Sequence, residues 1–178
     1  MSTTAAEKSG AFETFSFGAH FVTSVGRTSF NDYWDPTSGG RLQIDLPFYL
    51  GVLQTGVHVF GNDNERSDVP EFHATFLFLG WGYEWELPYR IGWFTGVQAG
   101  GLNMSFDDDA SQKELRTESE LGFGLHTAVR YPTRSRWSAL ISADFRRIHT
   151  YRRIDYGFVG VGISRRFMMP RWLREFLE

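Results

Sequence analysis

The chain has 178 residues, no cysteine and a formal net charge of −3 at neutral pH. This length suits one domain with a single core or barrel, and the lack of cysteine excludes disulfides and thiolate metal sites. The charge gives no basic footprint for nucleic acid. Glycine (19 residues) and aromatic residues (17%) are abundant, which favours a curved sheet over a helical protein.

Apolar runs in this sequence are short. No run of about 18 apolar residues occurs, so a transmembrane helix is excluded. The longest apolar-rich stretch, Ala74–Tyr83, has the length of a tilted membrane strand.

The first half of the chain reads as a leader followed by strands. Residues 1–11 are small and polar, which predicts a flexible leader. Polar, turn-forming residues predict long loops at 31–40 and 61–70 and a short turn at 47–51. Alternating apolar and polar residues predict four strands, at residues 12–25, 41–48, 52–60 and 71–87.

The second half continues the same pattern. Residues 107–120 form the longest and most acidic predicted loop, with six acidic and two basic residues. The connections at 88–90, 132–136 and 150–153 are short. Four more strands are predicted between them, at residues 92–100, 121–131, 137–146 and 154–167. Eight strands with alternating long and short connections are typical of outer-membrane barrels.

The last predicted strand, Ile154–Phe167, carries the closest resemblance to a known family. One face is apolar and ends in an aromatic ring, while the other is small with polar groups towards its end. The strand resembles the closing strand of small eight-stranded outer-membrane β-barrel proteins of Gram-negative bacteria, the OmpA/OmpX-like superfamily, which ends in Phe after alternating apolar residues. The residues of this barrel-closing signature are Val159, Val161, Ile163 and Phe167.

The resemblance implies an all-β, eight-stranded, antiparallel up-and-down transmembrane barrel over residues 12–167, located in the outer membrane. Apolar faces would meet lipid and polar faces would line the lumen. The lipid bilayer and lipopolysaccharide are then the expected partners, and no cofactor is expected. The first ten residues show no apolar signal-peptide core. Because such a protein must be exported, this interpretation requires that the signal has been removed.

Seven aromatic residues fall near the predicted short turns. Trp and Tyr gather at membrane interfaces, so these side chains predict an aromatic girdle at the periplasmic side. Ordinary strand aromatics in a soluble sandwich are the alternative. The seven are Trp81, Tyr83, Trp85, Tyr89, Trp93, Tyr131 and Trp137.

Eight charged residues fall on the predicted lumen faces. Because an unpaired buried charge is costly, charges of both signs inside a barrel of eight strands should pair and plug it. A narrow conductive path is the alternative. These ion-pair candidates are Arg41, Asp45, Glu84, Glu86, Arg130, Asp144, Arg146 and Arg166.

The last residues, 168–178, predict a short amphipathic helix that begins near Pro170. Its apolar face is a candidate surface for a membrane leaflet or for another envelope protein. A helix packed on the barrel end, or a frayed tail, is the alternative. The apolar residues are Trp172, Leu173, Phe176 and Leu177.

Catalytic and metal-binding motifs are weak. His58 and His73 flank one predicted loop, which makes them a weak metal candidate, and no metal site is predicted. Barrel enzymes that deacylate lipid A carry a His and a Ser two residues apart on a late strand. The nearest match here is His149 with Tyr151, so the nucleophile is missing and no catalytic residue is predicted.

The primary interpretation is therefore a non-enzymatic outer-membrane barrel with a structural, adhesive or complex-subunit role. Two alternatives stay open. One is a soluble lipocalin-like barrel that binds an apolar ligand, which would invert the inside and outside of every strand. The other is a lipid A-modifying barrel enzyme. The acidic loop at 107–120 is a candidate for divalent cations or a basic partner, with a solvated loop as the alternative.

Overall fold

A computed structural model describes residues 13–26, 31, 33–64, 70–106, 117–133, 136–149 and 154–177. Over these residues the chain forms eight strands, a 3-10 turn η2 (Pro88–Arg90) and a short helix α1 (Arg171–Leu177). The strands are β1 (Thr14–Ser24), β2 (Trp34–Phe48), β3 (Gly51–Asn64), β4 (Phe72–Leu87), β5 (Ile91–Phe106), β6 (Thr117–Pro132), β7 (Trp137–His149) and β8 (Ile154–Met168).

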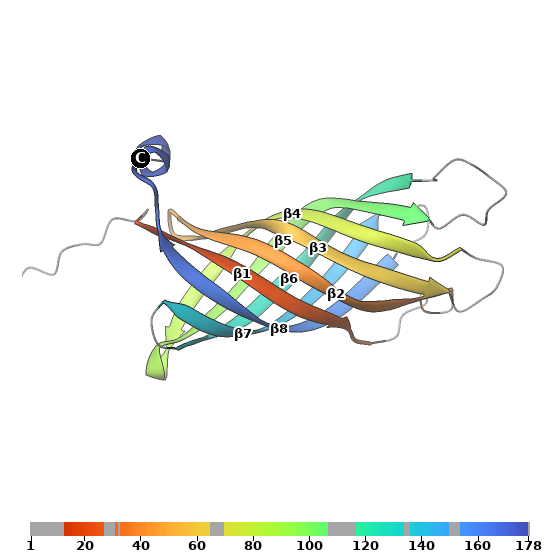
Figure 1. Ribbon diagram of the computed structural model, residues 1–178, viewed down its shortest axis with the longest axis horizontal. Helices are drawn as coiled ribbons and strands as arrows, with labels where there is room; N and C mark the ends of the chain where they lie inside the picture. Colours follow the sequence, from red (N-terminus) through yellow and green to blue (C-terminus); the bar gives the residue numbers. More distant parts are fainter. Residues whose placement is uncertain are drawn as a thin grey trace, which may run out of the picture.

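The eight strands close into an antiparallel up-and-down barrel (Figure 1). Each strand pairs with its sequence neighbours, and β8 closes the barrel on β1 from Thr14↔Met168 to Ser24↔Phe158. Closure therefore uses the strand predicted to seal the barrel. No described helix is long and apolar enough to cross a membrane.

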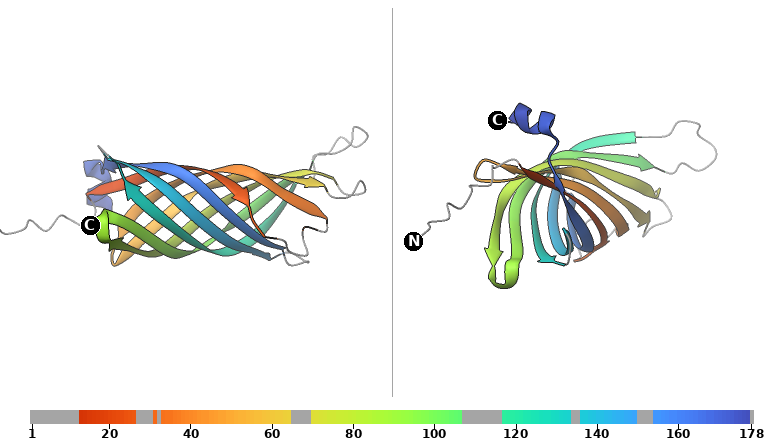
Figure 2. Two further views of the ribbon diagram at one scale, coloured as in Figure 1. Left: turned by 90° about the horizontal axis from the view of Figure 1, so that it is seen from below. Right: turned by 60° about the vertical axis from the view of Figure 1, so that its left-hand side comes forward.

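The strands tilt strongly around the barrel (Figure 2). The residue pairs give the stagger of the barrel. We start at Arg147 on β7 and step from each residue to its partner on the next strand, first to β6 and then around the barrel. The path returns to β7 at Trp137, ten residues earlier than it began. Such a stagger corresponds to a strand tilt of about 40°. Residues at one level of the lumen therefore come from very different sequence positions.

Side chains alternate between the wall and the lumen as the sequence predicts. On β2, Arg41, Gln43 and Asp45 are buried inside the barrel, while Leu42 faces outward and is exposed. On β4, five apolar or aromatic side chains face outward and are exposed, namely Leu77, Leu79, Trp81, Tyr83 and Trp85. A soluble lipocalin-like barrel requires the opposite arrangement, so that alternative is wrong.

Some predicted loop residues belong to strands. Residues 34–40 form the first half of β2, residues 61–64 extend β3, and residues 117–120 begin β6. In β2 the register shifts between Pro36 and Gly39. Such a bulge lets proline and glycine sit in a strand. The predicted leader and the centres of the long loops, including residues 107–116, lie outside the described residues.

The short turns, the start of β1 and the end of β8 lie at the same end of the barrel, which we call the turn end. The opposite end is the loop end. Helix α1 stands beside the turn end, outside the wall (Figures 1 and 2). Trp172 is 69% exposed. The side chains of Leu173, Phe176 and Leu177 lie outside the described part of the chain, so the apolar face of this helix stays a prediction.

Candidate functional site

The middle of the lumen is organised around the carboxylate of Asp144 on β7. Its Oδ1 accepts a hydrogen bond from Nη1 of Arg41 on β2 at 2.6 Å, and it lies 3.0 Å from Nδ1 of His126. The Arg41 and Asp144 side chains are 0% and 3% exposed. Nη2 of Arg146 lies 4.0 Å from the same oxygen. One carboxylate therefore faces two buried guanidinium groups.

A second polar group lies next to it, towards the turn end. Asp45 Oδ1 accepts hydrogen bonds from the amides of Gln43 and Gln54, both at 2.9 Å. Asp45 Oδ2 accepts from Nη2 of Arg130 at 2.8 Å, and Nη1 of Arg130 reaches Glu84 at 2.9 Å. Arg41 Nε also donates to Gln43 at 2.8 Å. Gln43 therefore joins the two groups into one network that crosses the lumen.

Aromatic rings cover the buried guanidinium groups. Arg146 stacks 3.8 Å from the ring centroid of Phe76 and lies 3.2 Å from Nδ1 of His58. Arg41 stacks 4.4 Å from Phe78. Cation–π contacts of this kind stabilise a desolvated charge by about 2 kcal/mol. The rings therefore supply attraction on faces of the guanidinium groups that hydrogen bonds do not reach.

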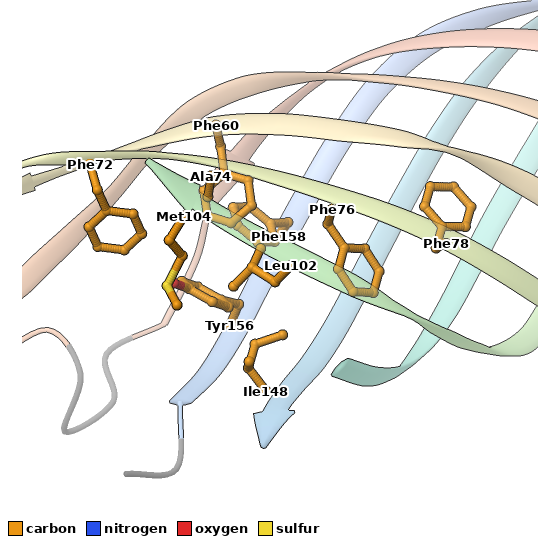
Figure 3. Close-up of a cluster of buried hydrophobic side chains, with 10 residues drawn as sticks. All are labelled: Phe60, Phe72, Ala74, Phe76, Phe78, Leu102, Met104, Ile148, Tyr156 and Phe158. Atoms are coloured by element: carbon orange, nitrogen blue, oxygen red, sulfur yellow. The ribbon is translucent and has the colours of Figure 1, made fainter. Parts of the chain in front are cut away.

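Towards the loop end the lumen becomes apolar (Figure 3). Aromatic and aliphatic side chains from β3, β4, β5, β7 and β8 pack together, with Phe60 and Phe158 at 4.9 Å between ring centroids. Trp34, Phe106 and Ile154 pack against this cluster. We call it the lumen plug, and its members are Phe60, Phe72, Ala74, Phe76, Phe78, Leu102, Met104, Ile148, Tyr156 and Phe158.

The turn end of the lumen is open and polar. A cavity of about 650 Å³ is lined by Glu84, Glu86, Arg130 and Arg166, among others. Six of the eight predicted lumen charges thus come together in the network, whereas Glu86 and Arg166 only line this cavity. Neither of these two forms an ion pair with a described residue, and both side chains are exposed at this end of the lumen.

An apolar belt surrounds the outside of the barrel. Along β7 the outward residues between Trp137 and Arg147 are Ala139, Ile141, Ala143 and Phe145. Ten residues of strand at this tilt span about 25 Å along the barrel axis. That matches the height of the apolar band on membrane barrels.

The seven predicted girdle aromatics all lie on the outer surface and are exposed. Trp81, Tyr83, Trp85 and Trp93 contact one another in sequence, with Trp85 and Trp93 5.5 Å apart between ring centroids. Tyr89 belongs to η2 itself. The aromatics therefore gather at the turn end of the belt.

The predicted histidine pair does not form. His58 is buried in the lumen and pairs with Phe76 in the register, whereas His73 pairs with Gly61 and is exposed on the outside. The weak metal candidate is therefore wrong, because the two side chains point to opposite faces. No group of three potential metal ligands occurs among the described residues. His149 faces outward, and Tyr151 lies outside the described residues.

Sequence reasoning missed the lumen plug. The signal was present, since β4 carries aromatic residues on both faces, and Tyr156 and Phe158 interrupt the small inner face of β8. It also missed the glutamines that bridge the charges. Gln54 and Gln98 are buried, and Gln98 Nε2 lies 3.4 Å from Gln54 Oε1.

Comparisons with known proteins agree with this architecture. No protein-family model and no curated protein matches the chain. Among solved structures, it is similar to Neisserial surface protein A, with a TM-score of 0.64, 13% identity, and coverage of 88% of this chain and 97% of that one. The N-terminal β-barrel domain of Pseudomonas aeruginosa OprF gives a TM-score of 0.54 at 13% identity, covering 88% and 98%.

The outer-membrane protein Ail of Yersinia pestis, in a phospholipid nanodisc, gives a TM-score of 0.51 at 15% identity, covering 87% and 99%. At this level of identity the similarity establishes the fold. The chain is thus a closed eight-stranded barrel of the kind found in small bacterial outer-membrane proteins.

Proposed function

We propose that this protein is a non-enzymatic integral barrel of a Gram-negative outer membrane, with a closed lumen and a structural role. One observation carries the proposal: every described strand puts apolar side chains outside, while ion-paired side chains from β2, β4, β6 and β7 lie inside the central lumen. In water such an arrangement would expose the apolar belt and bury charge. In a bilayer the belt meets lipid, and the charges are sheltered with their partners.

The closed lumen supports a structural role over conduction. Polar side chains bridge from β2 to β7 through Arg41 and Asp144, and the lumen plug fills the loop end. An eight-stranded barrel leaves an interior that side chains can fill. The outer surface then carries the function, in contact with lipid, lipopolysaccharide and other envelope proteins.

The location is supported by the fold neighbours, which are surface and outer-membrane proteins of bacteria. A crystal structure of Ail is described as a complex with the heparin analogue sucrose octasulfate. An adhesive role of that kind for this chain would depend on its loops, whose centres lie outside the described residues.

A second candidate role is that of a subunit docked through the tail. Met168 and Trp172 are both exposed at the turn end. The exposed apolar side chains there favour a partner on the periplasmic side. A photo-crosslinking residue at Trp172 should give a discrete adduct in cells, and the same residue at Tyr89, exposed at the same end, should not.

Membrane extraction and gel migration test the main proposal. The protein should leave the membrane fraction only with detergent and should migrate faster unheated than boiled, because a closed barrel resists unfolding in the gel. In planar bilayers it should show no discrete conductance. A protein that is monomeric and soluble without detergent would contradict the membrane assignment, and steady channels would contradict the closed lumen.

A further inference from the structure

The outer wall carries a hollow within the apolar belt. A groove of about 630 Å³ crosses the outer face from β3 to β7. Three small residues, Gly80, Ala99 and Gly124, are part of its lining and leave room between larger neighbours. Its sides come from Leu79, Val97, Phe123, Leu125 and Phe145.

Two polar side chains line the loop end of this groove. Arg147 and His149 both face outward on β7. Asp155 on β8 holds the guanidinium group of Arg147, with Nε to Oδ1 at 2.8 Å and Nη2 to Oδ2 at 3.5 Å. The ring of His149 packs edge-on against Phe123 at 5.6 Å. The cation is therefore fixed at the end of an apolar groove.

The height of Arg147 along the barrel axis corresponds to the level of the lipid headgroups. It lies ten residues from Trp137 on the same outward face of β7, which places it about 25 Å from that girdle residue along the barrel axis. A charged side chain on the lipid face costs about 0–1 kcal/mol near an interface but about 2–4 kcal/mol at the midplane. Arg147 is thus at the level where lipid phosphates lie.

We propose that this groove binds a phosphorylated lipid of the outer leaflet. An acyl chain of this lipid lies in the groove over Ala99, and the lipid phosphate accepts hydrogen bonds from Arg147 and His149. Asp155 occupies Nε and Nη2 of the guanidinium group, and Nη1 is bonded to none of the described residues. A cation held in place in this way loses little freedom on binding, and its bond to phosphate is charge-assisted.

This inference rests on the membrane assignment proposed above, and it adds one site on the barrel wall. The chemistry selects a lipid over a free phosphate, because the apolar groove contributes only when an acyl chain fills it. It also selects a phosphorylated lipid over a neutral one, because a hydrogen bond from Nη1 of Arg147 to a phosphate is charge-assisted and therefore stronger than one to a neutral acceptor.

Native mass spectrometry of the refolded protein in detergent micelles tests the site. Two probes with identical chains, dioleoyl phosphatidic acid and dioleoylglycerol, differ only in the phosphate. The variants are Arg147→Gln, which removes the cation, and Ala99→Phe, which fills the groove. The matched controls are Arg165→Gln, an outward arginine at the turn end, and Ala139→Phe, an outward alanine outside the groove.

The unmodified protein should retain phosphatidic acid about tenfold more strongly than dioleoylglycerol, the size of one charge-assisted hydrogen bond. Arg147→Gln should remove that difference, Ala99→Phe should abolish retention of both lipids, and the two controls should behave as the unmodified protein.

Equal retention in all variants would overturn the lipid site while leaving the barrel assignment intact, provided each variant still shows heat-modifiable migration. A second protein copy on this wall, seen as a dimer without bound lipid, would also overturn it. A chain that fails to show heat-modifiable migration in any variant and stays soluble without detergent would instead refute the membrane assignment.

Discussion

Replacing Asp144 with asparagine tests whether the lumen network stabilises the barrel. The change keeps the size of the side chain but removes its negative charge. Arg41 then loses its 2.6 Å ion pair while remaining fully buried. Arg146, 4.0 Å away, loses the same compensating charge. Removing one partner of a buried pair costs about 3–5 kcal/mol, because the remaining charge is left uncompensated.

Urea unfolding of the barrel in lipid vesicles, followed by tryptophan fluorescence and gel migration, measures this free energy of unfolding. Asp155→Asn is the matched control. It breaks the ion pair with Arg147 on the outer wall, where both side chains are partly exposed. The expected cost there is below about 1 kcal/mol.

The double variant Arg41→Met with Asp144→Asn should recover at least half of the loss, because the closer of the two uncompensated charges is gone while Arg146 keeps its own. If Asp144→Asn destabilises the barrel no more than Asp155→Asn does, the lumen charges are solvated and the reasoning fails.

Three further predictions concern the wall and the tail. Ile141→Lys, at the middle of the belt, should lower the free energy of unfolding in vesicles by about 2–4 kcal/mol. His149→Lys, at the edge of the belt, should lower it by about 0–1 kcal/mol. Equal losses for the two variants would contradict a bilayer around the belt. Gly82→Val should destabilise the barrel by about 1–3 kcal/mol, because an added Cβ would clash with the backbone oxygen of Thr95 on β5. Gly101→Ala, where an added Cβ meets nothing within 4 Å, should be neutral by the same urea assay. Ending the chain after Met168 should leave gel migration unchanged, since β1 and β8 pair up to that residue; loss of the folded band would show that the tail is needed for closure.

The sequence predicts the inside and outside of each strand because alternation is a local property. The outward Leu42 and the inward Arg41 and Asp45 follow from a period of two along the strand, whatever the neighbours are. Alternation needs no knowledge of which strands pair. The closing role of β8 was instead implied by its resemblance to the last strand of small outer-membrane barrels.

The partners within the lumen could not be predicted, because they depend on the stagger of the whole barrel. Arg41 and Asp144 are 103 positions apart, on strands β2 and β7 that do not pair with each other. Whether they meet is decided by the tilt, which sets the level each residue reaches. A stagger different by two residues would place Asp144 beside another side chain.

The ends of the strands also could not be predicted from the local sequence. Residues 34–40 contain Pro36 and two glycines, which favour a loop by composition. Their backbone nevertheless pairs with β3, from Trp34↔Asn64 to Gly40↔Val59, across the bulge. Tertiary pairing therefore overrides local turn preference where a neighbouring strand offers hydrogen-bond partners.

The polar network and the lumen plug place different requirements on the sequence. An apolar plug alone would seal the barrel at low cost, since it needs no paired charges. The polar network instead requires each carboxylate to meet its arginine, which only one stagger of the strands allows. The network therefore selects one register, and the plug supplies burial at the loop end. A barrel fixed in this way has little freedom inside, so we expect its function to reside on its wall, its loops and its tail.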